Sequence, residues 1–163
     1  MPEGALSIRL TALEDWQILK QIRLASLRDA PSAFVQTHAQ ASAISDQEWQ
    51  DRAAGLSEPR IIMAFIDGKA VGMIGGIRYE GEFNMASMWV SPEFRQIGIA
   101  SKLITGLKTF ARNQGYIQLI LQVAAANNAA IQCYLRQGFQ LCDNSAGAAP
   151  SFDDNDRKMV CLL

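Results

Sequence analysis

Hydrophobic residues recur along this chain with two spacings, one helical and one strand-like, and these spacings predict its elements. A short apolar strand is expected over residues 5–10, followed by a helix that ends before Pro31. Capping boxes at Thr11 and Ser45, each with a Glu three residues later, predict where the first two helices begin. The residues between these helices, 32–44, are expected to form a loop. The expected buried face of the first helix consists of Trp16, Leu19, Leu27 and either Ile22 or the stem of Arg23.

The central part of the chain predicts three strands joined by tight turns. Asp67-Gly68 and Glu80-Gly81 are turn signals that lie between apolar runs. Strands joined in this way pair antiparallel, so a meander is expected. Glycines inside the middle strand indicate a bulge or a close approach of another backbone or a ligand. The expected strands cover residues 60–66, 70–79 and 83–90, and the glycines are Gly72, Gly75 and Gly76.

The last part of the chain alternates between helices and strands. A helix is expected from about Gly98 to Gly115, and a second one over residues 127–137. The continuous apolar run between them, 117–123, is typical of a strand that is covered on both faces. The chain has no repeat, low-complexity tract or linker, so we expect one α+β domain over residues 1–163 with a β-α-β crossover. Two closing strands are expected over residues 139–142 and 158–163.

The charges of this chain argue against one class of partner and favour another. Fifteen Lys and Arg against sixteen Asp and Glu give a net charge of −1, which argues against nucleic acid binding. Residues 94–142 nevertheless hold five basic residues and no acidic one, whereas residues 143–156 hold four acidic residues and no basic one. A bound polyanion explains the basic middle of the chain, and solvated helix faces are the alternative. A chain of 163 residues is long enough to bury a core without disulfides or metals.

Cysteine and histidine are too few to build the sites that they commonly form. The three cysteines, Cys133, Cys142 and Cys161, lack metal-ligand spacing and are expected to be buried, reduced thiols in a cytoplasmic protein. His38 is the only histidine, so neither a zinc site nor a Ser-His-Asp triad is expected. The N-terminus lacks a signal-peptide pattern, and no apolar run of about 18 residues predicts a membrane span. We therefore expect no metal and no membrane association.

The segment from Met88 to Lys102 carries the main chemical signal. A strand ends, and a helix opens with small residues, Gly98 and Ala100, in its first turn. The first N–H groups of a helix have no intrahelical partner, so small residues there allow a phosphate to approach them. Lys102 lies in the same turn, where its charge opposes the helix dipole at a cost of up to about 1 kcal/mol that a bound anion would remove. The alternative interpretation is an ordinary helix start that binds no ligand. The segment lacks the first Gly and the Ser or Thr of a nucleotide P-loop, and the chain has no G-x-G-x-x-G dinucleotide motif.

Two motifs resemble the signature of a known family. Arg95-Gln-Ile-Gly-Ile-Ala100 is similar to the [RQ]-x-x-G-x-[GA] pyrophosphate loop of the GNAT superfamily of acetyl-CoA-dependent N-acetyltransferases. The resemblance implies an α+β fold with a mixed, mostly antiparallel sheet of about six or seven strands and about four flanking helices. A splayed pair of parallel strands in this sheet would hold coenzyme A. The second half of the signature is matched downstream by Val123, Asn127, Ala130, Tyr134, Gly138 and Phe139.

The resemblance also implies roles for individual residues, with acetyl-CoA as the cosubstrate. The backbone of Met88, Trp89 and Val90 would hold the acetyl group and the pantetheine arm, and the N–H group of Val90 would stabilise the oxyanion. Tyr134 would protonate the departing sulfur, and a core tyrosine is the alternative for this residue. The other residues expected to contact the cofactor are Arg95, Gln96, Ile97, Gly98, Ile99, Ala100, Ser101 and Lys102 around the pyrophosphate, and Asn127 and Ala130 along the pantetheine.

The motifs leave open which group takes the proton of the acceptor amine. Many members of the family carry a Glu about six residues before the strand-end Val, where this chain has Asn84, which cannot act as a base. Glu82 lies two residues earlier on the same face of the expected strand, and Glu80 lies in the turn. Either carboxylate would act through water; otherwise the amine arrives neutral.

The implied activity is transfer of an acetyl group to an amine of a small molecule or a protein, by direct attack without a covalent enzyme intermediate. The acceptor is expected opposite coenzyme A, with Phe34, His38 and the acidic segment Asp153–Asp156 as candidate contacts. Acidic residues would attract a cationic amine, and a solvated loop is the alternative for that segment. A regulatory module that binds acyl-CoA without catalysis is the alternative function. The sequence leaves a homodimer open.

Overall fold

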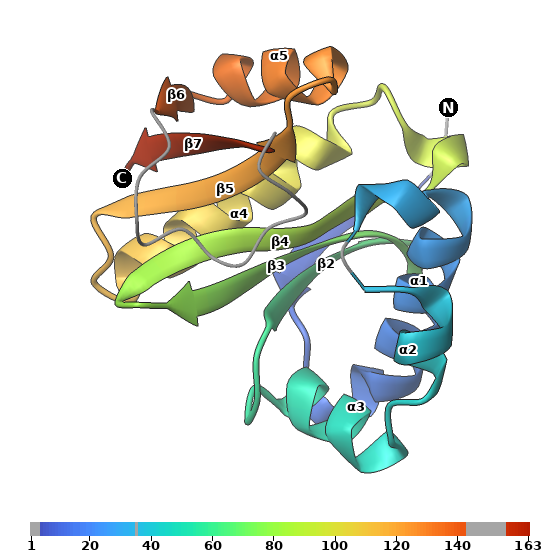
Figure 1. Cartoon of the computed structure of the whole chain (residues 1–163). Helices are drawn as coiled ribbons and strands as arrows, with labels where there is room; N and C mark the ends of the chain where they lie inside the picture. Colours follow the sequence, from blue (N-terminus) through green and yellow to red (C-terminus); the bar gives the residue numbers. More distant parts are fainter. Residues whose placement is uncertain (1–3, 35, 143–155) are drawn as a thin grey trace.

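A mixed sheet of seven strands forms the centre of the protein, with helices on both faces (Figure 1). The computed structural model describes residues 4–34, 36–142 and 156–163. The strands follow the order β1-β2-β3-β4-β5-β7-β6, and β4 and β5 are the parallel pair among the described strands. The strands are β1 (Leu6–Leu10), β2 (Arg60–Ile66), β3 (Lys69–Tyr79), β4 (Glu82–Val90), β5 (Gln118–Ala124), β6 (Gln140–Cys142) and β7 (Asp156–Leu162). The helices are α1 (Trp16–Asp29), α2 (His38–Ser42), α3 (Asp46–Ala54), α4 (Ile99–Asn113) and α5 (Asn128–Arg136).

Two apolar cores, one on each face of the sheet, hold the helices in place. On one face, α4 buries Leu103 and Leu107 completely against the strands. On the other face, α1 and α3 bury Leu19 and Trp49. Each fully buried side chain of this size stabilises the fold by about 1.5–3 kcal/mol. Because both faces are covered, β2 and β3 carry apolar residues almost without alternation, and the predicted α+β fold is confirmed.

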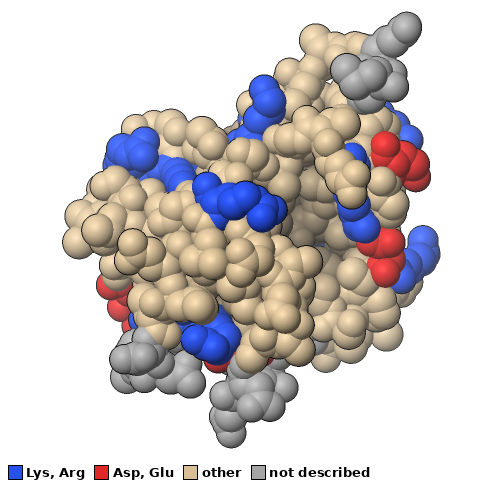
Figure 2. All heavy atoms as spheres, turned by 90° about the horizontal axis from the view of Figure 1, so that it is seen from above, with Lys and Arg blue, Asp and Glu red and all other residues tan. Residues whose placement is uncertain are grey.

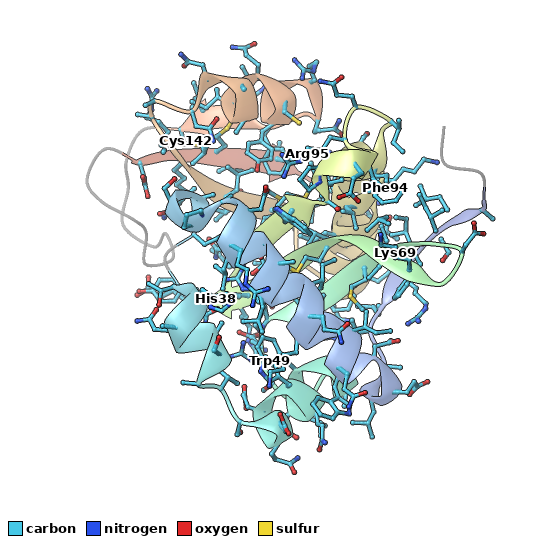
Figure 3. All side chains as sticks on the ribbon, turned by 90° about the vertical axis from the view of Figure 1, so that its right-hand side faces the viewer. His38, Trp49, Lys69, Phe94, Arg95 and Cys142 are labelled. Atoms are coloured by element: carbon cyan, nitrogen blue, oxygen red, sulfur yellow. The ribbon has the colours of Figure 1, made fainter. Side chains whose placement is uncertain are left out.

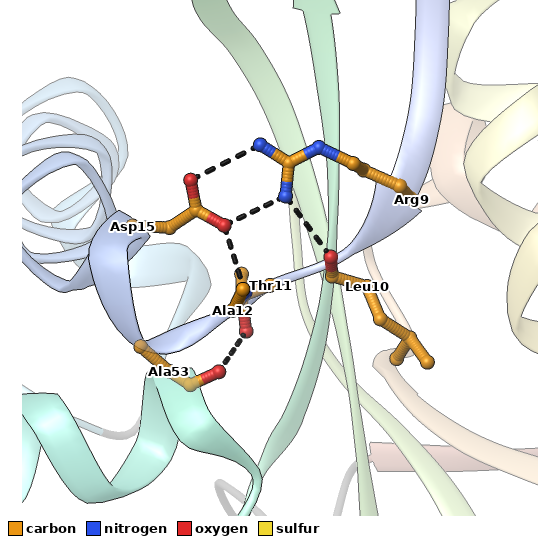
Figure 4. A network of polar contacts seen from close by, with 6 residues as sticks. All are labelled: Arg9, Leu10, Thr11, Ala12, Asp15 and Ala53. Atoms are coloured by element: carbon orange, nitrogen blue, oxygen red, sulfur yellow. Dashed lines mark hydrogen bonds and ion pairs between the residues drawn. The ribbon is translucent and has the colours of Figure 1, made fainter.

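The start of the first helix differs from the expected capping box at Thr11 (Figure 4). Asp15 accepts a hydrogen bond from the backbone N–H of Ala12 at 2.7 Å, in the place where Glu14 was expected to act. The Thr11 hydroxyl instead donates to the carbonyl of Ala53 in α3 at 2.9 Å. The local sequence does not show that α3 lies beside Thr11, so the competing partner was not predictable.

A helix also lies in the segment that was expected to be a loop. Thr37 accepts a hydrogen bond from the N–H of Gln40, and the Gln40 side chain accepts one from the N–H of Thr37, so a Thr-x-x-Gln capping box opens α2. The box at Ser45 is confirmed in part. Ser45 accepts a hydrogen bond from the N–H of Glu48, but the Glu48 carboxylate pairs with Arg52 instead of returning to the backbone.

Strand β4 separates from β5 part-way along its length. The two strands are paired at only two positions, of which the last is Asn84 opposite Ile120, although β4 continues to Val90. A bulge in β4 places two residues, Ser87 and Met88, opposite one residue of β3, and Ser87 has a φ of 56°. A bulge bends a strand and increases its twist, which turns this end of β4 away from its neighbour. The expected splayed parallel pair is therefore present.

Two glycines of β3 allow close packing around the splayed strand. A Cβ atom on Gly72 would lie 3.2 Å from the carbonyl oxygen of Trp89, and one on Gly76 would lie 2.1 Å from the ring of Phe83. A larger residue at either position would push β4 or its core contacts away. The predicted close approach of another backbone is confirmed at Gly72.

The cysteines differ from the prediction in their burial. Cys161 is buried, whereas Cys133 and Cys142 are half-buried and free, so the expectation of three buried thiols was wrong for two of them. Both lie on elements at the edge of the sheet or its outer helix layer, which the apolar pattern alone does not locate. In the described part of the chain, no helix is long and apolar enough to cross a membrane.

Candidate active site

Six consecutive backbone N–H groups without a partner lie where β4 leads into α4. Over the described residues, the N–H groups from Gln96 to Ser101 donate to no protein acceptor, and the first bond of the helix runs from Lys102 N–H to the Gly98 carbonyl. Gly98 has a φ of 89°, and a side chain added there would meet nothing within 4 Å. We call residues 96–101 the N–H cradle. Its free donors and the positive end of the α4 dipole suit an anionic ligand.

The charges near the cradle favour an anion as well. The stretch without Asp or Glu, residues 94–142, covers all of α4 and α5. Figure 2 looks onto the α5 end of the molecule and shows Lys and Arg side chains scattered over this face, with the few Asp and Glu side chains toward its edges. Lys102 is exposed in the first turn of α4. A bound anion would remove the unfavourable interaction between this cation and the helix dipole.

Arg95 connects the start of the cradle to the rest of the protein (Figure 3). Its Nη2 donates to the Asp29 carboxylate at 2.6 Å, and its Nε donates to the Val90 carbonyl at 2.9 Å. The same carboxylate accepts a hydrogen bond from the Trp89 indole at 2.9 Å. The bonds from Trp89 and Arg95 lower the pKa of Asp29. Arg95 therefore joins the end of α1 to the end of β4 and fixes where the cradle begins.

Backbone groups at the end of β4 point into the opening beside β5. The N–H of Ser91 donates to the Val71 carbonyl of β3 at 2.8 Å. Because alternate residues of a strand direct their backbone groups to opposite neighbours, those of Val90 and Met88 point toward β5. Trp89, the third residue predicted for this role, directs its backbone to β3 and its indole to Asp29. The structure thus brings two of the three predicted residues to the opening.

Helix α5 lies on the other side of the opening and carries the predicted acid. The side chain of Asn127 accepts a hydrogen bond from the N–H of Ala130 at 3.2 Å, so it caps α5. Tyr134 contacts Phe139 edge to face, with ring centroids 5.9 Å apart. Burial raises the pKa of Tyr134 to about 12, so the phenol is protonated at neutral pH and can donate its proton. Among the described residues its hydroxyl has no hydrogen-bond partner.

Two side chains hold α5 against α4. Lys108 donates a hydrogen bond to the Gln137 carbonyl at the C-terminal end of α5. Ser101, a residue of the cradle, donates its hydroxyl to the Gln137 side chain at 3.2 Å. A cation at the last carbonyls of a helix is favourable both as a hydrogen-bond donor and toward the helix dipole. These contacts set the position of Tyr134 relative to the cradle.

Asn84 occupies the last paired position before β4 and β5 separate. It is only 3% exposed, and neither atom of its side-chain amide, Oδ1 or Nδ2, has a hydrogen-bond partner in the described part of the chain. In register its neighbours are Ile77 on β3 and Ile120 on β5. Phe83, the preceding residue, packs on the α4 side of the sheet, so Asn84 faces the side covered by α1.

Glu82 lies at the far end of β4 from the bulge. Its carboxylate accepts a hydrogen bond from the Gln118 side chain at 3.1 Å. Met88 is six residues further along, or about 20 Å at 3.3 Å per residue. The structure therefore places Glu82 on the same strand as the predicted acetyl site but does not bring the two together.

The residues predicted to bind the acceptor lie on the α1 side of the sheet. Phe34 lies beneath the Arg23 guanidinium, 4.7 Å from its central carbon. His38 begins α2 near α1 (Figure 3), and its Nε2 atom is buried without a partner. Burial and the nearby Arg52 lower the pKa of Arg23 to about 10. Of the predicted acidic segment, residues 153–155 lie outside the described residues, and Asp156 is buried at the start of β7.

Sequence reasoning missed Asp29, which the structure places against Trp89 and Arg95. Asp29 ends α1, where a negative charge opposes the helix dipole, and that unfavourable position was the available signal for a cationic partner. The stem of Arg23 was expected as an alternative to Ile22 on the buried face of the same helix, but the contact of Arg23 with Phe34 was not predicted, because it depends on how the chain returns after Pro31.

The N–H cradle beside a splayed pair of parallel strands matches the arrangement that the resemblance to the GNAT superfamily implies. The family model described as Acetyltransferase (GNAT) family matches residues 19–139. Because this match covers most of the chain, the protein belongs to the GNAT acetyltransferase family.

Individual relatives agree with this assignment. N-acetyltransferase 8 from Homo sapiens is 32% identical over 78 residues, which are 44% of this chain and 34% of the relative. The chain therefore spans about a third of the length of the curated relatives that it matches.

Two solved structures share the fold over nearly the whole chain. A GNAT-family acetyltransferase from Streptococcus pneumoniae has a TM-score of 0.77 and 18% identity, over 98% of this chain and 100% of its own. The PaiA N-acetyltransferase from Thermoplasma acidophilum, solved in complex with coenzyme A, has a TM-score of 0.71 and 16% identity, over 98% and 99% of the two chains. At these identities the likeness establishes the fold.

Proposed function

We propose that this protein transfers an acetyl group from acetyl-CoA to an amine by direct attack of the amine on the thioester. The observation that carries the proposal is the N–H cradle, whose six free donors lie next to the opening between β4 and β5. Membership of the GNAT acetyltransferase family and the coenzyme A bound to the Thermoplasma relative support the same ligand.

The residues present fit coenzyme A along its length. Pyrophosphate would accept hydrogen bonds from the cradle, where Gly98 leaves open space and Lys102 adds positive charge. The pantetheine arm, which has amide groups, would pair with the backbone groups of Met88 as a further strand does. The Val90 carbonyl already accepts a hydrogen bond from Arg95, which leaves the Val90 N–H for the acetyl group. Asn127 and Ala130 would line the other wall at the start of α5.

The chain supplies groups for each change of charge in the transfer. The lone pair of a neutral amine forms the new C–N bond, the C–S bond breaks, and its electron pair leaves with the sulfur. The N–H of Val90 would stabilise the negative charge that develops on the carbonyl oxygen. Tyr134 would give its proton to the sulfur, and the proton that the nitrogen loses restores the phenol through water.

The proton of the incoming amine has two routes in this proposal. Glu82 is the nearest carboxylate on β4 and would act through a chain of water molecules, given its distance from the bulge. An amine that arrives neutral needs no base. The buried amide at Asn84 favours the second route because an amide does not take up a proton at neutral pH.

A second candidate function is a regulatory module that binds acyl-CoA without catalysis. The observation that favours it is the same amide at position 84, where a carboxylate would be expected in an enzyme that deprotonates its acceptor. The two candidates differ in whether any amine releases coenzyme A from acetyl-CoA. Measuring free thiol with a panel of small amines, peptides and lysine derivatives would separate them, since a module stays silent with every amine.

The cradle itself is tested by Gly98→Asp with Gly81→Asp as a matched control. Both glycines have a positive φ, 89° and 80°, and open space around the added side chain, so both variants bear similar backbone strain. Only Gly98→Asp places a carboxylate where the pyrophosphate is proposed to bind. We expect it to weaken coenzyme A binding at least about 100-fold in calorimetry, while Gly81→Asp binds like the wild type. Equal affinity in the two variants would contradict the assignment.

A further inference from the structure

We propose that Asn84 binds the acceptor directly, and that the acceptor is the amino-terminal end of a peptide. This inference rests on the proposed function and adds the substrate class to it. Asn84 would hold the backbone of the acceptor with both atoms of its side-chain amide and so orient the α-amine toward the acetyl group.

The first step of the argument is the state of the Asn84 side chain. A buried amide usually satisfies its donor and its acceptor, because leaving either unpaired costs folding free energy. Asn84 is 3% exposed, yet over residues 4–34, 36–142 and 156–163 neither its Oδ1 nor its Nδ2 finds a hydrogen-bond partner. Ile77 and Ile120, its neighbours in register, offer no polar side chain. An apolar residue would suit this position better unless a ligand supplies the missing partners.

The position of Asn84 in the sheet provides the second step. It is the last residue of β4 that is paired with β5, so it lies at the inner end of the opening. Met88, the nearest residue proposed to hold the acetyl group, is four residues away, or about 13 Å along the strand. A ligand that spans this distance, with its reactive nitrogen near Met88, reaches Asn84 with a group further along its length.

The unpaired atoms indicate the chemistry of that group. The ligand must offer a hydrogen-bond donor to Oδ1 and an acceptor to Nδ2, side by side. In an extended peptide the N–H and the C=O of one residue point to the same side, so a single residue offers both. Simple alkylamines offer no such acceptor.

The pKa of the acceptor amine also favours a peptide with a free α-amine. Asn84 cannot remove a proton, so the acceptor has to be neutral when it attacks. An α-amine has a pKa of about 7.7–8.0, and a lysine side chain has one of about 10.4. At pH 7.5 about a third of the α-amine is neutral, compared with about one lysine amine in a thousand.

The test compares three amines with wild-type protein and acetyl-CoA. They are tetra-alanine amide, whose extended length of about 13 Å matches this span, Nα-acetyl-lysine amide and propylamine, and release of coenzyme A gives kcat/KM for each. We expect kcat/KM for the peptide to be at least about tenfold higher than for the other two amines. A preference for the lysine derivative or for propylamine would overturn the proposal. Silence with all three amines, or failure to bind acetyl-CoA at all, would instead refute the proposed acetyl transfer on which this inference rests.

Asn84→Leu then tests the residue, since leucine has a similar size and no polar atoms. We expect a higher melting temperature, because an unpaired buried amide is removed, together with a KM for the peptide raised at least about tenfold. Binding of acetyl-CoA should stay unchanged. Unchanged peptide kinetics in this variant would overturn the role of Asn84.

A control and a second variant complete the experiment. Ile61→Leu changes a buried residue on the same face of the sheet and should leave the peptide KM as in the wild type. Asn84→Ser shortens the side chain but keeps a polar group, so it serves if the leucine variant does not fold. It should raise the peptide KM as well, and a wild-type KM would again refute the proposal.

Discussion

Tyr134 is the residue whose surroundings match its expected chemistry most closely. Burial against Phe139 and the outer core disfavours the phenolate and raises the pKa from its ordinary value of 10.0 to about 12. The group is therefore a proton donor over the whole neutral range. Because the neutral form is the buried one, this burial contributes to stability below pH 10 and the contribution is lost as the pH rises toward 12.

We expect Tyr134→Phe to lower kcat for acetyl transfer at least about tenfold, because the sulfur loses its proton donor. The affinity for coenzyme A should barely change, since the ring still packs. In the wild-type protein the same pKa predicts that ionisation of Tyr134 does not lower kcat between about pH 9 and 11. Steady-state kinetics at several pH values measures kcat, and calorimetry measures the affinity for coenzyme A. Tyr116→Phe, which alters a tyrosine stacked on Phe83, is the matched control. Equal kcat in the Tyr134→Phe variant would remove its role as acid.

At the scale of elements, the site depends on how α5 is held against α4. The predicted motifs lie on separate segments of the chain, and only the contacts from Lys108 and Ser101 to Gln137 set their relative position. The opening between β4 and β5 also depends on more than one element. It results from the bulge in β4, which bends that strand away from β5.

Lys108→Met tests the contact between these helices. Methionine keeps most of the apolar stem that packs near the Phe139 ring but cannot donate to the Gln137 carbonyl. We expect a loss of about 1 kcal/mol, which is a fall of about 2–4 °C in the melting temperature of a chain of this size.

Lys69→Met is the matched control, since Lys69 also lies over an aromatic ring, that of Phe94 at 5.5 Å. The exposed Lys69 should contribute less. An equal loss of stability in both variants would mean that ring contacts, and not the helix end, account for the effect of Lys108.

At the scale of the whole molecule, charge is distributed unevenly although the total is close to neutral. Acidic residues lie in the first part of the chain and after α5, and the cofactor side carries cations alone over residues 94–142. The first part of the chain contains the ion pair that joins β1 to the start of α1. Arg9 and Asp15 lie 2.7 Å apart, and Asp15 is almost fully buried while Arg9 is half exposed.

We expect Asp15→Asn to destabilise the protein by about 1 kcal/mol at pH 7, a modest value because Arg9 is half exposed to solvent. The hydrogen bond from Arg9 lowers the pKa of Asp15 from its ordinary value of 3.8. A lowered pKa contributes stability above that ordinary value, and the contribution is lost as the pH falls through the folded value.

Urea unfolding at several pH values would show this behaviour. The difference between wild type and Asp15→Asn should be complete above about pH 5 and shrink below about pH 4. Asp46→Asn, which alters a mostly exposed ion pair with Lys20, should show a smaller difference at pH 7. A difference for Asp15→Asn that does not depend on pH would contradict the electrostatic explanation.

Local pattern alone was enough to place most elements and the cradle. Turn signals at Asp67-Gly68 and Glu80-Gly81 predicted the meander, and the small residue at Gly98 marked the start of α4. These features depend on neighbours in sequence: a two-residue turn or a helix terminus is decided by the dihedral angles and free N–H groups of a few residues. Helix α2 was also predictable from local sequence, because its Thr-x-x-Gln capping box is present there, but it was expected to be a loop.

Tertiary structure decided what depends on contacts between distant segments. The partner of Thr11 is in α3, Arg95 is held by Asp29 of α1, and Asn84 is left without a partner between two isoleucines. No local pattern determines these pairings, because each depends on which side chains the sheet order brings together across many residues. The sequence by itself determined the fold class and the small residues that open α4. The three-dimensional structure decided which polar groups are satisfied, and the Asn84 amide is one of the buried groups that it leaves without a partner among the described residues.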